Sequence, residues 1–377
     1  MTNKKIIKFS DICREVKITT QTPIIDGYER YVGLEHLDSG SLNIKRWGMI
    51  SEDNPSFTRV FKKGHILFGK RRPYLRKAAI AEFDGICSGD IIVMEAKGEH
   101  YLHALIPYIC QSDDFWEYAI KNSSGSLSPR TKFSFLKNYQ LRHMSASEQG
   151  KCLAKIHKID NVLGKLDGVL TSLQNLKEKT LNQLFTIDTV DRNETVGTEL
   201  FKILGGYAPS KINFNPDGNV GYFKVDDFNK NENHRNLIIS SERFNVEEQA
   251  NNISILNEGF LIFPKRGAAI FKNRVGILGK KATVDSNLMA LECFNIESKY
   301  LRVYLEWFGL HNISDNSGIP QINNKHVYPL LIPVFNKEYR NGVIEFDDYV
   351  SSIFDFIAEK KKELIFLMRQ LTKIFKV

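Results

Sequence analysis

The chain has few of the features that mark membrane, secreted or zinc-binding proteins. None of its 377 residues belongs to a run approaching 18 consecutive apolar residues, so no membrane span is expected. The five cysteines are odd in number, scattered and without a C-x-x-C pair, which argues against disulfides and zinc sites. The opening segment MTNKKIIKFSDI lacks the apolar run of a signal peptide. These absences predict a cytoplasmic protein without a metal site.

Complete catalytic motifs are also lacking. Residues 64–70 (GHILFGK) resemble a phosphate-binding P-loop, but Arg71 stands where a hydroxyl should hold Mg²⁺, and the intervening residues favour a strand. Residues 54–57 (NPSF) differ by one residue from the Asn-Pro-Pro-Phe signature of amino-directed DNA methyltransferases. No glycine-rich turn that could hold a methyl donor accompanies them. We therefore expect a strand at the first motif and a turn at the second.

One candidate metal cluster stays open. Asp90, Glu95 and Lys97 resemble the Asp…Glu-x-Lys group with which many nucleases position Mg²⁺ and water. The corresponding segment of a repeat described below begins at Asn287 and has one carboxylate and no lysine. A half-exposed strand with charged outward positions explains the same residues. The Mg²⁺-dependent nuclease is therefore an alternative hypothesis.

What the chain does contain is a repeat of domain length. Residues 64–71 (GHILFGKR) and 259–266 (GFLIFPKR) have the same order of glycine, apolar residues, breaker and basic pair. Between Asp53 and Glu82 lie eight Lys or Arg and no acid, and between Glu258 and Asp285 lie six and none. Such self-similarity indicates a tandem duplication with one acid-free basic surface in each half.

The repeat extends on both sides of this motif. Residues 31–38 align with 221–228, and residues 87–90 align with 284–287. Aromatic helical stretches follow in both halves and end in polar Ser-Gly turns. Short strands, one helical layer and many turns predict that each copy is an α+β domain.

Each copy is followed by a long helical pattern. Residues 151–185 contain no proline, and apolar residues recur there at alternating steps of three and four. The same alternation runs from Phe346 to Ile374 and is broken only at Lys360. The predicted seam consists of Ile156, Ile159, Leu163, Leu166, Leu170, Leu173, Ile353, Ile357, Leu364, Leu367, Leu371 and Ile374.

Two long helices alternating with two globules favour an antiparallel coiled coil. A helix of about 35 residues spans about 52 Å, so the first would hold the globules apart and the second would return along it. The simpler alternative is that each helix packs only on its own domain.

The basic segments suggest nucleic-acid binding. Arginine can grip phosphate or a guanine edge with two hydrogen bonds, whereas lysine mainly neutralises phosphate. A single charge run is often only a solvated face, but acid-free runs at equivalent places in both copies favour DNA. The candidate contacts are Lys70, Arg71, Arg72, Tyr74, Arg76, Lys77, Ser88, Lys265, Arg266, Lys272, Arg274 and Asn287, of which Arg71 and Arg266 are the strongest.

The whole chain resembles the DNA-specificity subunit of type I restriction-modification systems. The resemblance rests on residues 31–37 (YVGLEHL), 64–77 (GHILFGKRRPYLRK), 85–91 (GICSGDI) and the two Leu-rich helices. It implies two target-recognition domains, 1–148 and 188–342, and two conserved spacer helices, 149–187 and 343–377. Each domain would read half of a bipartite DNA site.

The resemblance also implies the partners. The helices would set the spacer and dock two methyltransferase subunits, and restriction subunits would join the complex. This chain would be no enzyme and hold no cofactor, with S-adenosylmethionine, ATP and Mg²⁺ bound by its partners. A coiled-coil adaptor that binds protein rather than DNA remains a further alternative.

Overall fold

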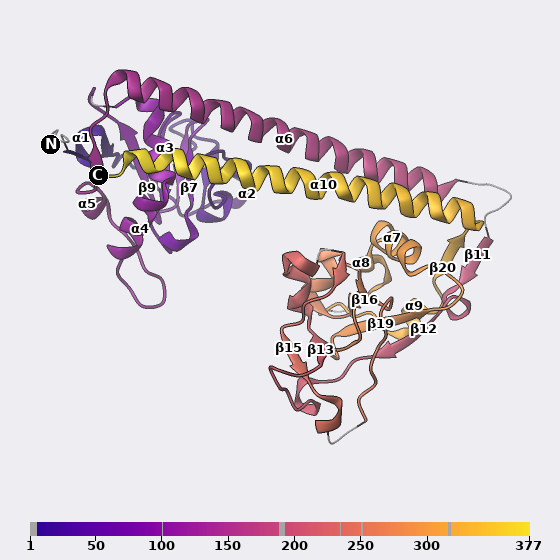
Figure 1. Cartoon of the computed structure of the whole chain (residues 1–377). Helices are drawn as coiled ribbons and strands as arrows, with labels where there is room; N and C mark the ends of the chain where they lie inside the picture. Colours follow the sequence, from indigo (N-terminus) through magenta and orange to yellow (C-terminus); the bar gives the residue numbers. More distant parts are fainter. Residues whose placement is uncertain (1–5, 100, 188–192, 234, 250–251, 316–317) are drawn as a thin grey trace. The chain divides into compact units, whose positions relative to one another are not determined.

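The computed structural model describes residues 6–99, 101–187, 193–233, 235–249, 252–315 and 318–377. The chain divides into two compact units, unit 1 (Met1–Asp167 with Ala358–Val377) and unit 2 (Gly168–Ile357). Each unit contains one globular part and one segment of each long helix, α6 (Ala146–Thr186) and α10 (Lys337–Thr372) (Figure 1). The predicted α+β class with two long helices is confirmed.

Unit 1 is built on two four-stranded sheets, ordered β2-β9-β6-β7 and β4-β3-β8-β5, with β1 paired to β10. Only β3 and β8 run parallel among these pairs. The elements are β1 Ile6–Lys8, α1 Phe9–Ile12, β2 Cys13–Glu15, β3 Arg30–Val32, β4 Gly48–Met49, α2 Ile50–Asp53, β5 Arg59–Phe61, β6 Ile66–Gly69, β7 Ala78–Ile80, β8 Gly85–Cys87, β9 Ile91–Ala96, α3 Ile106–Gln111, α4 Asp113–Lys121, α5 Phe133–Leu136 and β10 Gln140–Arg142.

Unit 2 repeats this plan with a five-stranded sheet, β12-β19-β16-β17-β14, and a three-stranded sheet, β15-β13-β18. β11 pairs with β20 as β1 pairs with β10, and β13 runs parallel to β18 as β3 does to β8. The elements are β11 Asn193–Val196, β12 Phe201–Gly205, β13 Val220–Phe223, β14 Asn236–Leu237, β15 Glu242–Phe244, β16 Leu261–Pro264, β17 Gly276–Leu278, β18 Ala282–Val284, β19 Leu288–Cys293, α7 Ser298–Phe308, α8 Leu310–Ile313, α9 Asn324–Val327 and β20 Leu331–Val334.

The repeat holds in the sheets, with one shift of register. The motif 64–70 forms β6, as expected of a strand, and its counterpart forms β16. The N–H of Ser88 donates to the carbonyl of Val32 (3.0 Å), and the N–H of Asp285 donates to that of Phe223 (2.8 Å). Val32 therefore corresponds to Phe223 and not to Tyr222, so the sequence alignment of 31–38 was wrong by one residue.

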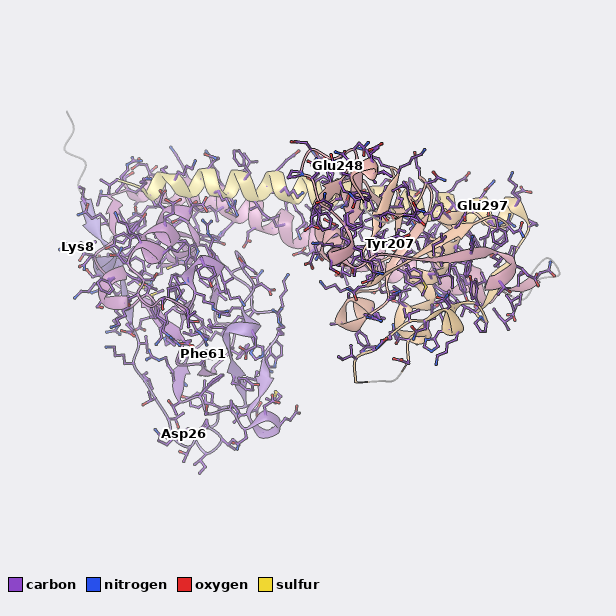
Figure 2. All side chains as sticks on the ribbon, turned by 90° about the horizontal axis from the view of Figure 1, so that it is seen from below. Lys8, Asp26, Phe61, Tyr207, Glu248 and Glu297 are labelled. Atoms are coloured by element: carbon purple, nitrogen blue, oxygen red, sulfur yellow. The ribbon has the colours of Figure 1, made fainter. Side chains whose placement is uncertain are left out.

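The cores follow from the apolar strands. In unit 1, β6 and β9 alternate their side chains between two clusters, because successive residues of a strand face opposite sides of the sheet. Phe68 stacks on the buried Trp116 at 4.2 Å between ring centroids, so the helical layer closes one cluster. Figure 2 shows Asp26 at the end of unit 1 far from Lys8, with Phe61 between them.

Within each unit, the two long-helix segments run in opposite directions side by side (Figure 1). In unit 1, Lys361 of α10 pairs with Asp167 of α6. In unit 2, the hydroxyl of Tyr339 donates to the carbonyl of Leu184 at 3.0 Å. No helix in the described ranges is long and apolar enough to cross a bilayer.

The predicted seam is only partly packed. Its α6 members are buried or half-buried, and so are Ile353, Ile357, Leu364 and Leu371 of α10. Leu367 is 51% exposed, because the partly buried row passes through Met368 instead. Ile374 is exposed because it follows the end of α10, in the 3₁₀ turn Lys373–Phe375, where Phe375 is the buried residue. These two residues are corrections to the predicted seam.

Candidate nucleic-acid interface

In each unit, the predicted basic segment forms a pair of loops with a segment that follows the helical layer. We call residues 70–76 and 265–273 the first loops, and residues 123–131 and 318–322 the second loops. In unit 1, Arg71 and Arg130 form an antiparallel bridge. The N–H of Arg72 donates to the carbonyl of Pro129 (2.7 Å), and that of Thr131 donates to Lys70 (3.0 Å).

Unit 2 reproduces the same bonds. Arg266 and Gln321 form the bridge, the N–H of Gly267 donates to the carbonyl of Pro320 (2.9 Å), and that of Ile322 donates to Lys265 (2.9 Å). Bridge partners place their side chains on the same face. Each unit therefore presents an arginine of the first loop beside one polar residue of the second loop, Arg130 or Gln321.

In unit 1, a carboxylate lies between the two arginines. Asp90 accepts from the Nε of Arg130 (2.9 Å) and lies 3.5 Å from a guanidinium nitrogen of Arg71. Burial acts to raise the pKa of Asp90, but the hydrogen bond and charge of Arg130 and the charge of Arg71 outweigh it and lower that pKa. Since like charges directly opposite each other repel, the carboxylate allows the two arginines to share one bridge.

In unit 2, the site has a different composition. The N–H of Lys70 donates to the carbonyl of Asp90, and that of Lys265 donates to the carbonyl of Asn287, both at 2.9 Å, so Asn287 occupies the place of Asp90. Two neutral amides, Asn287 and Gln321, thus accompany Arg266. Burial lowers the pKa of Lys265, and the charge of Arg266 lowers it further.

Arg72 has a strained backbone. Its φ is +52° and its ψ is +61°, in the left-handed region that non-glycine residues rarely adopt. The corresponding residue of unit 2 is Gly267, with φ +69°, for which this conformation costs nothing. Arg72 is exposed, and its Nε donates to the hydroxyl of Ser128 at 3.3 Å. Such strain is common at binding sites, which supports a functional role for this side chain.

Several predicted contacts have partners inside their own unit. Arg76 pairs with Asp113 at 2.5 Å. Lys77 donates to the carbonyl of Leu34 at 2.7 Å. Arg274 donates to the carbonyl of Phe228, and Lys272 lies 3.5 Å from the amide oxygen of Asn229. These four basic residues, which lie at the end of the first loops or directly after them, are bound to neighbouring segments of their own unit.

Ser88 has a structural role. Its hydroxyl accepts from the N–H of Asp90 at 3.2 Å, and the carboxylate of Asp285 accepts in the same way from Asn287 at 2.6 Å. These are local turns that Ser and Asp side chains favour. Tyr74, by contrast, is 52% exposed at the tip of its loop.

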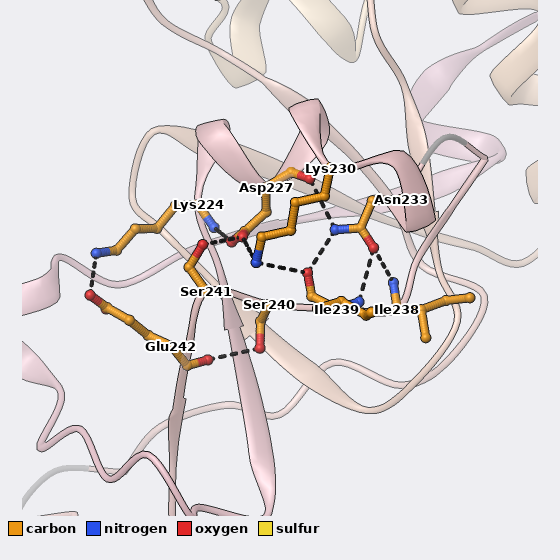
Figure 3. A network of polar contacts seen from close by, with 9 residues as sticks. All are labelled: Lys224, Asp227, Lys230, Asn233, Ile238, Ile239, Ser240, Ser241 and Glu242. Carbon is orange, nitrogen blue, oxygen red and sulfur yellow. Dashed lines mark hydrogen bonds and ion pairs between the residues drawn. The ribbon is translucent and has the colours of Figure 1, made fainter. Parts of the chain in front are cut away.

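A buried carboxylate stabilises the turn whose Phe228 carbonyl accepts a hydrogen bond from Arg274. Asp227, fully buried, accepts from the N–H of Lys224 (2.8 Å), pairs with Lys230 (2.8 Å) and accepts from Ser241 (Figure 3). In unit 1, His36 performs one of these tasks, because its Nδ1 accepts from the N–H of Gly33 at 3.0 Å. Both turns thereby offer a carbonyl to the basic residue directly after the first loop, Lys77 or Arg274.

Sequence reasoning missed the contribution of the second loops. Arg130, Ser128 and Gln321 were not among the candidate contacts, although the Ser-Gly turns preceding them were noticed. The signal was weak because a short polar turn carries no periodicity. The bridge itself joins residues 59 positions apart in unit 1, and no local pattern reveals such pairing.

The candidate nuclease cluster is dispersed. Asp90 precedes β9 and Glu95 lies near its end, so about 16 Å of strand separates them. Glu95 pairs with Arg14 at 2.5 Å, and Asp90 is held by Arg130. No group of three metal-ligating side chains occurs among the described residues. The NPSF segment is a turn, in which Asn54 ends α2 with φ +43°.

Comparisons with known proteins agree with this architecture. No family model matches the chain. The EcoDI type I restriction enzyme specificity subunit of Escherichia coli is 25% identical over 155 residues, 40% of this chain and 34% of that protein. The MjaIX specificity subunit of Methanocaldococcus jannaschii is 24% identical over 350 residues, 82% of this chain and 76% of that protein. By these matches the chain is similar to specificity subunits of type I restriction-modification systems.

Solved structures show the same fold. A chain from a study of assembly and conformational transition of the type I restriction-modification system covers 98% of this chain, with a TM-score of 0.62 and 18% identity. The specificity subunit from M. genitalium covers 100% of it, with a TM-score of 0.54 and 14% identity. The alignment with the E. coli relative spans about a third of that protein's length.

Proposed function

We propose that this specificity subunit recognises a bipartite DNA site, each unit reading one half. The observation that carries the proposal is the duplicated pair of loops, with Arg71 and Arg266 at the same bridge position. The net charge of +8 and the acid-free segments around both arginines favour a polyanionic partner. Protein loops that face the grooves of DNA read bases through arginine and amide side chains.

The two half-sites should differ, making the whole site asymmetric. Unit 1 offers two guanidiniums braced by a carboxylate, whereas unit 2 offers one guanidinium beside two amides. Arginine pairs best with guanine and Asn or Gln with adenine. We therefore expect a G-directed contact at both sites and an additional A-directed contact from Asn287 or Gln321.

The chemistry is assigned to partner subunits. The nuclease cluster is dispersed, and the relatives bear the name of specificity subunits. In this proposal, α6 and α10 dock two methyltransferase subunits and set the spacing between half-sites, and restriction subunits join the complex. S-adenosylmethionine, ATP and Mg²⁺ are assigned to those partners, and the complex works in the cytoplasm.

Coexpression with the neighbouring methyltransferase gene tests this function. Genome-wide mapping of methylated adenines should reveal one split motif with two unlike halves. Methylation at no defined motif, or at an unsplit motif, would contradict the proposal.

A salt titration separates DNA reading from the protein-binding adaptor. The purified complex should show a steep fall of DNA affinity with salt, because bound phosphates release counterions, whereas an adaptor shows no DNA affinity. Arg71→Ala or Arg266→Ala should reduce the slope by about one if the contact is to phosphate. A base contact should cost about 1–3 kcal/mol on the cognate duplex alone. Unchanged binding in both variants would mean that Arg71 and Arg266 are ordinary solvent-exposed residues that do not contact DNA.

A further inference from the structure

Both paired loops carry large apolar side chains in solvent. In unit 1, Tyr74 is 52% exposed and Leu127 is 92% exposed. In unit 2, Phe271 is 64% exposed and Ile319 is 67% exposed. Each pair comprises an aromatic residue from the first loop and an aliphatic residue from the second.

The topology brings the members of each pair to the same end of the bridge. In unit 1, the bond from Arg72 to Pro129 is the last backbone hydrogen bond between the described residues of the two loops in this direction, and Tyr74 and Leu127 both lie beyond it. In unit 2, Phe271 and Ile319 lie in the same way beyond the bond from Gly267 to Pro320. The aromatic residues also correspond, because each lies two residues before a left-handed residue that ends the 3₁₀ turn, Arg76 or Asn273.

The loop segments that carry these exposed apolar side chains are well packed. In the first loops, Pro73 and Ile270 are buried directly before the exposed aromatic residues. In the second loops, Thr131 and Ile322 are buried four and three residues after the exposed aliphatic residues. Each loop is therefore anchored in the core close to its exposed apolar side chain. Holding an apolar side chain in water forgoes the benefit of burial, so its recurrence at matched places in both units indicates a surface that becomes covered.

The charges beside these exposed side chains indicate which kind of molecule covers them. Arg72 and Arg130 are exposed next to the tip of unit 1, and Arg266 is exposed next to that of unit 2. Duplex DNA combines a phosphate rim for such arginines with apolar base faces inside the groove. Apolar side chains inserted between base pairs are a known means of unstacking a step and kinking DNA.

We propose that each pair of exposed apolar side chains, one from each loop, acts as a wedge. The wedge enters a base step of its half-site and partly unstacks it. The inference rests on the proposed function and adds a DNA-deforming role to it. The arginines hold the backbones while Tyr74 with Leu127, or Phe271 with Ile319, displaces neighbouring base pairs. Recognition then includes the ease with which a step opens, so each half-site should contain a flexible pyrimidine–purine step at the wedge.

Fluorescence of 2-aminopurine tests the wedge. The complete methyltransferase complex is mixed with duplexes of the mapped site that carry 2-aminopurine at single positions other than the methylated adenines, since methyltransferases flip their target base. Wild type should raise the fluorescence severalfold at one step in each half-site. The variant Tyr74→Ser with Leu127→Ser should abolish the rise in one half-site only, and Phe271→Ser with Ile319→Ser should abolish it in the other, each with about tenfold weaker binding.

Phe294→Ser is the matched control. Phe294 is 55% exposed but follows the opposite end of β19 from Asn287, and its removal should leave both signals intact. Tight binding by wild type without a fluorescence rise, or a rise unchanged in the Ser variants, would overturn the wedge and leave the proposed function standing. Failure of wild type to bind the mapped duplex would instead refute the proposed function.

Discussion

At the bridge itself, the side chains of the two paired loops sum to the same charge with different residues. Unit 1 places Asp90 between Arg71 and Arg130, which leaves one positive charge, and unit 2 places two amides beside Arg266, which leaves the same. The backbone bonds around both sites are nearly identical. On the proposed function, diverged copies can keep a scaffold and a charge for the DNA backbone while the side chains proposed to face the bases change.

The strongest test of this comparison is an exchange of whole domains. Replacing residues 1–148 by the matching domain of a relative should change one half-site completely and leave the other as it was. Replacing 188–342 should do the converse, because each paired-loop site is contained within one unit. Methylation mapping reads the result, and a swap that alters both half-sites would refute independent readers.

The spacing between half-sites should respond to the helices alone. Inserting four residues between Leu166 and Leu173 lengthens α6 by about 6 Å and approximately preserves the seam phase. Since B-DNA rises about 3.4 Å per base pair, the gap should grow by one or two base pairs with both half-sites retained. Methylation mapping of an active mutant with an unchanged gap would show that the helices do not set the distance.

How much the sequence could predict differs between the parts of the site. The helices, the basic first loops and the repeat follow from local or copied patterns. The brace at Asp90 could not be predicted, because it depends on Arg130, a residue 40 positions away on a polar loop. The internal partners of Arg76, Lys77 and Arg274 were also invisible, since a basic residue looks the same in sequence whether it faces solvent or a carbonyl.

A second difference between the units concerns stability against pH. In unit 1, the Nε2 of Gln111 donates to the carbonyl of Ala78 at 2.7 Å. In unit 2, Glu306 accepts from the N–H of Val275, the residue matching Ala78, at 3.4 Å. Burial raises the pKa of Glu306 to about 7 from 4.5, while Arg302 opposes the shift.

This raised pKa makes the stability of unit 2 fall as the pH rises. The contribution of Glu306 to the free energy of unfolding is fully present below pH 4.5 and is lost as the pH rises through about 7. The reason is that the carboxyl group keeps its proton to a higher pH in the folded protein than in the unfolded chain. Glu306→Gln should remove that slope and raise the free energy of unfolding at pH 8 by about 1–3 kcal/mol. Thermal unfolding at pH 5 and pH 8 checks it; an equal slope in the variant would refute the role of Glu306.

Exchanging Asp90 and Asn287, which lie at equivalent places beside the two bridges, tests the role of the charge at each bridge directly. Asp90→Asn should cost about 1 kcal/mol of stability, because Arg71 and Arg130 then repel, and adding Arg130→Gln should restore most of it. Denaturant unfolding measures both. Asn287→Asp in unit 2 should hardly change stability but weaken DNA binding severalfold, since the new carboxylate neutralises Arg266. A loss of stability not rescued by Arg130→Gln would contradict the brace.

The smallest expected effect concerns Arg72. Arg72→Gly should raise the free energy of unfolding by about 0.5–1 kcal/mol through relief of the left-handed strain, and yet weaken DNA binding. Arg72→Lys keeps charge and strain and should leave the melting temperature unchanged. Gly267→Arg is the reciprocal change; a Cβ at this position would meet no atom within 4 Å, so the variant should lose stability through the left-handed strain at φ +69°. Arg72→Gly with normal DNA affinity would mean that the strain serves no contact.

The return of α10 to unit 1 has a consequence for synthesis. Phe375 is buried against Tyr101 in the core of unit 1, and Lys376 pairs with Asp114 at 2.5 Å. A ribosome makes these residues only after all of unit 2. The globular part of unit 1, although translated before unit 2, can therefore complete its core only after Ala358–Val377 have been made. On the proposed function, a frameshift at the boundary between unit 2 and Ala358 should damage recognition of the half-site read by unit 1.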